Sequence, residues 1–407
     1  MLELNCDFHI HSKYSRGTSK DMELPLIGGQ AALKGLNVVA TGDALHPSWL
    51  SHLKDNLIED EGLYKTRTSD TRFIIQTEVE DDHRVHHVIL LPSIEAAEKL
   101  KRALERHSMD MSADGRPHLS INGEEIAGHV KDVEGMIGPS HAFTPWTSLY
   151  KEYDSIKECY GGNLKHVKFL ELGLSADTSM ADRIGELSGL TFTTNSDCHS
   201  PWPQRLGREF NRILVEKYSF DEIRKAISHD GGRKFTLNAG LNPKEGKYHV
   251  TACTRCYTKF RMADAIKQKM RCPECRGIIK KGVADRIEEL ATSEKPRHPE
   301  HRPPYMHIIP LAEAIALALG ISNPNTQKVK DVWEKLVSQF KTEINIIIDE
   351  PVENLAKANP MVAKVVSKLR KDELYYIAGG GGKYGIPTLE KPKDDYYKGG
   401  QKTLKDW

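Results

Sequence analysis

The sequence predicts an α/β fold in which βα units surround a largely parallel sheet or barrel, followed by two smaller parts. Three observations carry this prediction. Short apolar runs alternate with longer helical stretches up to about Thr236, a pattern typical of βα units. Two Cys-x-x-Cys pairs come next, and beyond a stretch rich in proline and charge the apolar spacing becomes helical.

Six apolar runs fit the strands of the first part. They are residues 38–40, 72–75, 87–91, 136–138, 169–172 and 191–194. Between them, residues 93–107 and 178–187 have helical spacing. Because such folds place their chemistry at the C-terminal ends of the strands, polar residues at those ends are the candidates for a site.

Asp7, His9 and His11 form the first candidate group. Residues i and i+2 of a strand share a face, so these three side chains are expected to point together. Burying them without a partner is costly, and a metal ion is the natural partner. A satisfied polar cluster at a strand end is the alternative.

Acidic and histidine residues also recur at the ends of the later strands. They are Asp43 with His46, Glu78, His87, His141, and Asp197 with His199. Each alone is more often structural, but together they form the kind of set found in barrel active sites. Clustered divalent cations lower the pKa of bound water and clamp the oxygens of a phosphoryl centre. We therefore expect phosphoester hydrolysis, with imidazole and carboxylate ligands that favour Zn, Mn or Fe over Mg alone.

In this order, the motifs resemble those of the polymerase and histidinol phosphatase (PHP) superfamily, over about residues 1–235. The resemblance implies a distorted (β/α)7 barrel with two or three divalent cations (Zn²⁺, Mn²⁺ or Mg²⁺). It makes Glu78, His141, Asp197 and His199 both metal ligands and catalytic residues, and it adds His9 and His11 as ligands. Asp43 and His46 match the second motif, but two residues separate them, so one or both are candidate metal ligands. His86 and His87 compete for one position, and we prefer His87 because it directly precedes the apolar strand.

The cysteine pairs predict a closed structural zinc site, because their spacing falls in the zinc-ribbon range. The ligands are Cys253, Cys256, Cys272 and Cys275. A pair of redox dithiols is the alternative. The other three cysteines are expected to be free thiols, which suits a reducing compartment.

Charge is concentrated in the cysteine module. The whole chain has a formal net charge of +1, which argues against a uniformly basic nucleic-acid coat protein. Residues 253–281 nevertheless hold nine Lys or Arg against two acidic residues, a net charge of +7. Such a module can neutralise phosphates, with salt-dependent affinity; a solvated basic face is the alternative. Lys259, Arg261 and Lys267 are its candidate DNA contacts.

A PHP barrel, a four-cysteine ribbon and a helical C-terminal segment together resemble the endonuclease Q family, up to about Tyr384. Among the segments that carry this resemblance are residues 41–47, 171–177, 282–286 and 302–311. It implies a metal-dependent DNA repair endonuclease that cuts 5′ of deaminated bases (uracil, hypoxanthine, xanthine) or abasic sites. Damaged pairs cost less to open, which itself gives selectivity.

Four further residues are nominated for contacts with DNA. Ser175 and Asp177 are candidates for reading the lesion base, although Asp177 could instead cap the next helix. Arg205 and Arg208 are candidates for phosphate contacts, although exposed charges can be silent. A small-molecule phosphoesterase, acting on histidinol or sugar phosphates with a purely structural ribbon, is the alternative function.

The expected domains are a barrel (1–238), a zinc module (244–290), a linker (291–304), a helical domain (305–378) and a flexible tail (379–407). No apolar run approaches the roughly 18 residues of a membrane helix, and the polar start does not resemble a signal peptide. We expect a cytoplasmic monomer with no membrane partner, whose helical faces could bind a replication or repair protein.

Overall fold

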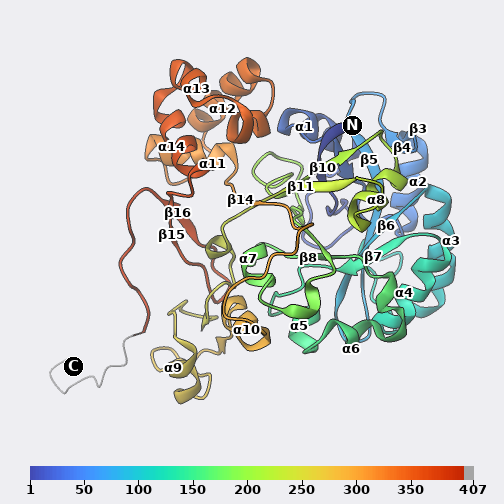
Figure 1. Ribbon diagram of the computed structural model, residues 1–407, viewed down its shortest axis with the longest axis horizontal. Coiled ribbons are helices and arrows are strands. Elements are labelled where there is room, and N and C mark those ends of the chain that lie inside the picture. The colour runs from blue at the N-terminus through green and yellow to red at the C-terminus, as the bar shows by residue number, and fades with distance from the viewer. Residues whose placement is uncertain (398–407) are drawn as a thin grey trace.

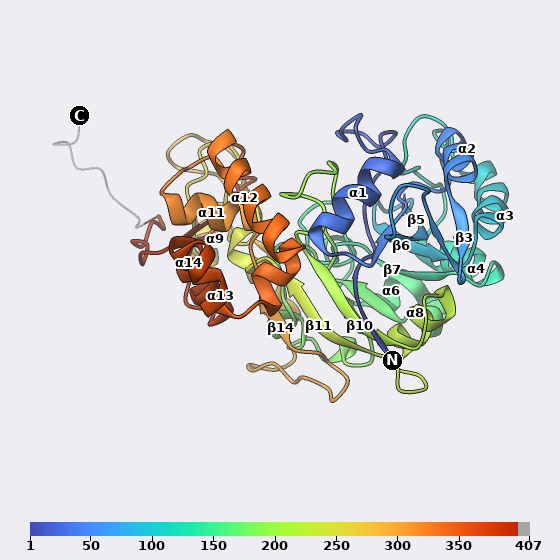
Figure 2. The ribbon, with the colours of Figure 1, turned by 90° about the horizontal axis from the view of Figure 1, so that it is seen from above.

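The computed structural model describes residues 1–397. A barrel built from the first 240 residues carries the cysteine module and the C-terminal helices on one side, to the left in Figure 1. Figure 2 shows the same helices standing beside the barrel from above. Among residues 1–397, no helix combines the length and the apolar character needed to cross a membrane.

Ten strands form the main sheet, along the path β14-β11-β10-β1-β2-β5-β4-β3, with β6 and β7 continuing from β5. They are β1 (Leu2–Asp7), β2 (Val38–Ala40), β3 (Ile58–Asp60), β4 (Leu63–Lys65), β5 (Arg72–Glu80), β6 (His86–Leu91), β7 (Met136–Pro139), β10 (Phe210–Val215), β11 (Lys234–Gly240) and β14 (Tyr305–His307). A separate parallel pair consists of β8 (Phe169–Glu171) and β9 (Thr191–Thr193). Single bridges from Val167 to Ile137 and from Cys198 to Ile10 close these strands into a barrel.

The barrel is less parallel than the sequence predicts. β6 runs antiparallel to both β5 and β7. Only five residues, 81–85, connect β5 to β6, and a parallel crossover needs a dozen or more. Asp81 stabilises this short turn by accepting the backbone N–H groups of His83 and Val85 at 2.9 and 2.7 Å.

Helices cover the barrel with apolar faces that join its core. The longer ones are α1 (Leu24–Lys34), α2 (Pro47–Asn56), α3 (Ile94–Leu104), α4 (Gly123–Asp132) and α8 (Phe220–Ser228), and the short ones are α5 (Leu149–Glu152), α6 (Ile156–Tyr160) and α7 (Thr178–Ala181). Side-chain caps at Ser93, Asn122 and Ser219 begin α3, α4 and α8. The helix expected over residues 178–187 is a single turn followed by a 3₁₀ turn.

The cysteine module consists of β12 (Ala252–Cys253), α9 (Met262–Lys267), β13 (Ile279–Lys280) and α10 (Val283–Leu290). The C-terminal helices are α11 (Leu311–Leu319), α12 (Gln327–Phe340), α13 (Val352–Ala358) and α14 (Pro360–Arg370). A buried ion pair joins these helices to the barrel, because Lys34 Nζ lies 2.6 Å from Glu343 Oε1. Lys34 also donates to the carbonyl of Pro203 at 2.7 Å, in the loop that follows His199.

Two segments expected to be a linker and a flexible tail pack against the rest of the chain. In the first, the buried Arg302 pairs with the buried Asp182 at 2.9 Å. In the second, β15 (Tyr375–Ile377) and β16 (Ile386–Thr388) form a hairpin, and Gly380 bridges to Val250. Residues 398–407 of the expected tail lie outside the described residues.

Candidate metal centre

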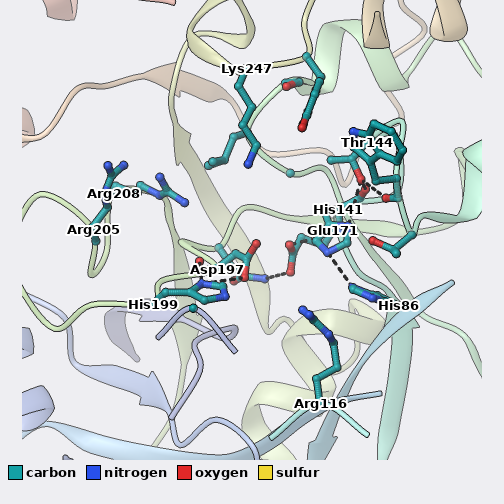
Figure 3. Close-up of a pocket in the computed structure, with 18 of the residues that line it drawn as sticks. His86, Arg116, His141, Thr144, Glu171, Asp197, His199, Arg205, Arg208 and Lys247 are labelled. Atoms are coloured by element: carbon teal, nitrogen blue, oxygen red, sulfur yellow. Dashed lines mark hydrogen bonds and ion pairs between the residues drawn. The ribbon is translucent and has the colours of Figure 1, made fainter. Parts of the chain in front are cut away.

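A pocket of about 640 Å³ opens at the C-terminal ends of the barrel strands. His141 follows β7, Glu171 ends β8, and Asp197 and His199 follow β9. Figure 3 shows these side chains converging on the pocket floor, with Arg205, Arg208, Lys247 and Arg116 reaching in from its sides.

Glu78, on β5, is fully buried next to His86 and His141 of the pocket lining. Its Oε1 atom is 3.3 Å from His86 Nδ1, 3.3 Å from His141 Nε2 and 3.7 Å from His9 Nε2. Its Oε2 atom is 3.5 Å from His11 Nε2. One carboxylate thus faces four imidazoles, an arrangement that suits a carboxylate bridging two metal ions.

Asp197 supplies a second carboxylate, which faces the same nitrogen of His11 as Glu78 does. Its Oδ1 atom lies 3.2 Å from His11 Nε2, 3.9 Å from His9 Nε2 and 3.8 Å from His199 Nδ1. The backbone N–H of Asp197 donates to the His9 carbonyl at 3.0 Å. This bond holds the two motifs, which are nearly 190 residues apart in the sequence, against each other.

A second layer of oxygen atoms holds the rings of the central histidines. Glu171 Oε2 is 2.8 Å from His9 Nδ1, and Asp43 Oδ1 is 3.1 Å from His11 Nδ1. Glu80 Oε2 is 2.9 Å from His86 Nε2. Each carboxylate fixes one ring nitrogen, which leaves the other nitrogen pointing at Glu78. Histidine ligands of metal ions are held in this way.

The inner atoms of this cluster lack hydrogen-bond partners within the described chain. They are His9 Nε2, His11 Nε2 and Glu78 Oε1, all buried. Buried polar atoms without partners are costly, and here they face one another across a distance that metal ions would fill. The donor set, imidazole with carboxylate, therefore fits a centre of divalent cations.

Electrostatics support this fit. Burial opposes protonation of His9 and His11, but the surrounding carboxylates outweigh it and raise their pKa values to about 9 and about 10. Burial alone would raise the pKa of Glu78, but His86, His9 and Arg116, the last at 3.1 Å, hold it well below its ordinary value. The cluster thus attracts positive charge, as either protons or metal ions.

The preference for His87 over His86 is corrected by strand geometry. Glu80 pairs with His86 across β5 and β6, and Glu78 pairs with Val88. His86 therefore shares the face of both glutamates, while His87 points to the other face. There, its two ring nitrogens lie 2.7 Å from the Tyr160 hydroxyl and 3.2 Å from Asp81 Oδ2.

The irregular second motif and Asp7 also differ from expectation. Asp43 stands behind His11 and accepts from Ser12 at 2.6 Å, so it supports a ligand. His46 caps the N-terminus of α2, where its side chain accepts a hydrogen bond from the backbone of Trp49. Its Nε2 atom lies 3.1 Å from the carbonyl oxygen of Ser112. Asp7 turns away from His9 and His11 and accepts the backbone N–H of Ser196 at 3.1 Å. It ends β1, so the chain beyond it no longer alternates as a strand.

The four module cysteines come together as their spacing predicts. Their sulfur atoms all lie within 4.8 Å of one another, with Cys253 and Cys275 at 3.4 Å and Cys256 and Cys272 at 3.6 Å. Sulfurs arranged tetrahedrally at a Zn–S distance of 2.3 Å are about 3.8 Å apart. The group therefore fits one zinc ion. A third buried group, Asp81 with His87 and Cys159, is already satisfied by internal hydrogen bonds.

The candidate DNA contacts divide into two sets. Ser175, Arg205 and Arg208 line the pocket. Asp177 instead caps α7, accepting from Met180 at 2.9 Å, as the alternative to base reading predicts. In the zinc module, Lys259 is buried against Asp395 and Arg261 lies 3.7 Å from Asp394, whereas Lys267 is largely exposed.

Several pocket residues were missed by reasoning from the sequence. They are Arg116, Trp146, Glu171, Lys247, Tyr248 and Tyr384. Glu171 could have been found, because it ends a predicted strand as Glu78 does. Lys247, Tyr248 and Tyr384 follow no barrel strand, and only tertiary packing brings them to the pocket.

Comparisons with known proteins agree with this architecture. The model of the MJ0043 C-terminal domain family matches residues 310–373. The lesion-specific endonuclease PfuEndoQ from Pyrococcus furiosus is 45% identical, with a TM-score of 0.90 over 100% of this chain and 99% of that one. A structure of endonuclease Q with a 27-mer duplex substrate, carrying an abasic lesion at the active site, is 45% identical with a TM-score of 0.91, covering 99% of this chain and 100% of that one.

The uncharacterized protein MJ0043 of Methanocaldococcus jannaschii is 46% identical over 272 residues. That match covers 66% of this chain and only 34% of MJ0043, so the matched region spans about a third of that relative's length.

Proposed function

The chain belongs to the endonuclease Q family, and from this premise we propose that it is a metal-dependent DNA repair endonuclease. It cuts duplex DNA at an abasic site or a deaminated base (uracil, hypoxanthine or xanthine). The cut lies on the 5′ side of the lesion and leaves a 3′-hydroxyl and a 5′-phosphate.

One observation carries the proposal: five imidazoles and two carboxylates cluster at and beneath the floor of a pocket whose walls hold several cations. Glu78 and Asp197 provide the carboxylates, and Arg205, Arg208 and Lys247 line the pocket above them. A phosphodiester needs both parts, because its charge must be neutralised while its phosphorus is attacked. The complex of a 45% identical endonuclease Q with abasic DNA supports the same substrate class.

Seven side chains would hold the cations. They are His9, His11, Glu78, His86, His141, Asp197 and His199. When bound, two or three ions of Zn²⁺, Mn²⁺ or Mg²⁺ would supply Lewis acidity and a nucleophilic water. One further Zn²⁺ would tie the four cysteines together and keep the module folded.

The chain itself orients the site. Glu171, Asp43 and Glu80 fix the histidine rings before any substrate arrives, so no reorganisation is needed during the reaction. Arg116 balances the charge of Glu78 from the pocket side. A damaged nucleotide is easier to extrude than an intact one. Ser175 lines the pocket and would contact the extruded base.

The Asp197→Asn variant tests the proposal. It should bind a duplex that carries one deoxyuridine and should fail to nick it, while the unchanged protein nicks it once. Loss of binding with retention of cutting would overturn the role given to Asp197. Turnover of free phosphate monoesters without DNA nicking would instead support a small-molecule phosphoesterase.

A further inference from the structure

Residues 379–385 form a glycine-rich loop that is seated tightly between the barrel and the zinc module. Gly379 N donates to Lys244 O at 2.7 Å, Gly382 N to Lys247 O at 2.9 Å, and Gly385 N to Glu245 O at 2.9 Å. A Cβ atom on Gly385 would lie 2.1 Å from Lys244 O. Close backbone packing therefore leaves no room for a Cβ atom at Gly379, Gly380, Gly381 or Gly385.

The loop carries Tyr384 into the pocket. Its ring centroid is 5.8 Å from the Arg205 guanidinium carbon and 5.8 Å from Lys247 Nζ, and its phenol faces Arg208. Three cations from two separate segments thus surround one phenol. Arg208 is itself buried, and its Nε donates to the carbonyl of Ser196 at 3.0 Å.

None of these three cations forms an ion pair within residues 1–397, although Asp197 and Glu209 lie near Arg208. Within residues 1–397, no carboxylate oxygen lies within 4.0 Å of the charged nitrogens of Arg205, Arg208 or Lys247. Glu313 lies near both arginines, but burial raises its pKa, which weakens it as a counter-ion. Burial would raise the pKa of Tyr384 as well, yet the three cations lower it below the ordinary value. The Tyr384 phenol therefore lies where three cations favour a negatively charged group.

We propose that Tyr384, Arg205, Arg208 and Lys247 form a phosphate-binding subsite of the pocket, distinct from the metal centre. The inference rests on the proposed function, and its ligand is a non-scissile backbone phosphate of DNA next to the lesion. The cations neutralise that phosphate, and the Tyr384 hydroxyl donates a hydrogen bond to it. The subsite sets where the strand lies relative to Glu78 and Asp197.

Phosphate neutralisation tests this assignment. Each phosphate near one abasic site is replaced in turn by an uncharged methylphosphonate, and duplex binding is measured by fluorescence anisotropy. All proteins carry Asp197→Asn so that the duplex stays uncut. One replacement should weaken binding about tenfold, as expected for the loss of a charge-assisted hydrogen bond.

The penalty should depend on the subsite. In the Tyr384→Phe and Arg205→Met variants, the same replacement should cost less than threefold, because the contact is already lost. Tyr375→Phe, on the exposed part of the same hairpin, should keep the full penalty. Arg205 is exposed, so its variant tests the proposal even if Tyr384→Phe is unstable.

The outcomes separate the subsite from the proposed function. Equal penalties in all variants overturn the subsite, and nicking of unmodified DNA by the unchanged protein would then leave the proposed function standing. If the binding penalty falls in the Tyr384→Phe and Arg205→Met variants but the unchanged protein never nicks DNA, the proposed function is overturned and the subsite is retained. If inorganic phosphate at millimolar concentration competes equally with every duplex, the subsite binds free phosphate and the assignment to DNA fails.

Discussion

Glu78 shows how one buried residue organises a reactive centre. Its two oxygen atoms face His9, His11, His86 and His141, and its charge is balanced by Arg116. A carboxylate this deeply buried is stable only with such partners. Glu171, Asp43 and Glu80 contact the ring nitrogens that face away from Glu78.

His86 and His87 give a direct test at single-residue resolution. We predict that His86→Ala abolishes nicking and lowers the bound metal, because His86 Nδ1 lies 3.3 Å from Glu78. His87→Ala should retain metal and measurable nicking while lowering the melting temperature, because it removes a buried contact to Tyr160. Metal content, nicking rate and thermal melting of both variants check this. Metal loss in His87→Ala alone would restore the original preference.

The buried Glu209 predicts a pH-dependent stability. Burial raises its pKa to about 8, so between its ordinary value of 4.5 and about 8 the folded chain holds a proton that the unfolded chain has released. Stability contributed by this group is therefore present at low pH and is lost as pH rises towards 8.

Removing the charge of Glu209 should remove this loss. Glu209→Gln should stabilise the protein at pH 8 by up to about 4 kcal/mol and have little effect at pH 5. Urea unfolding at the two pH values measures the difference. An equal effect at both would show that Glu209 is not held protonated.

Residue-level prediction from the sequence succeeded where one motif determines the geometry. The four cysteines and His9, His11 and Glu78 meet as their patterns indicate. It failed for His86 and His87 because the two neighbours point to opposite faces of a strand. Only the register with β5 decides which of them faces Glu78, and the sequence does not contain that register explicitly.

At the scale of elements, strand positions were easier to predict than strand directions. β2 spans Val38–Ala40 as expected, and α11 spans Leu311–Leu319 with Gly320 in the left-handed conformation at its end. The helical domain expected over residues 305–378 ends early, because α14 ends at Arg370 and Asp372 adopts a positive φ of 54°. β15 then follows, in a segment whose apolar residues fit the repeat of a helix as well as that of a strand.

The glycine-rich loop is the element whose role the sequence concealed. We predict that Gly385→Ala lowers the nicking rate at least tenfold, because its Cβ would collide with Lys244 O and displace Tyr384. Gly189→Ala is a matched control, since a Cβ there has no neighbour within 4 Å. Steady-state nicking and thermal melting of the two variants check this. Equal activity in both would show that the loop does not position Tyr384.

At the scale of the whole molecule, charge is distributed less simply than the +7 of residues 253–281 indicates. Lys259 and Arg261 meet Asp395 and Asp394 of the C-terminal segment, while Lys267 projects outward. The chain thus neutralises part of its own basic module. The pocket cations add a second basic region that net charge does not reveal.

The salt dependence of DNA binding should distinguish the exposed Lys267 from the buried Lys259. Lys267→Met should reduce the slope of log affinity against log salt concentration by about one, as for one lost phosphate contact. Lys259→Met should leave the slope unchanged, because its charge is paired with Asp395. Anisotropy titrations between low and moderate salt measure both. A reduced slope in Lys259→Met together with an unchanged slope in Lys267→Met would show that the DNA contacts Lys259 and not Lys267.

The central claim is that one metal centre, built around Glu78, cuts DNA at a lesion. The most direct test maps the products of a metal-loaded protein on a duplex with a single abasic site or deoxyuridine. We predict one nick on the 5′ side of the lesion, a 3′-hydroxyl end, and loss of the nick in EDTA or in His86→Ala. A folded, metal-loaded protein that leaves this duplex intact, or that cuts undamaged DNA equally well, would contradict the account.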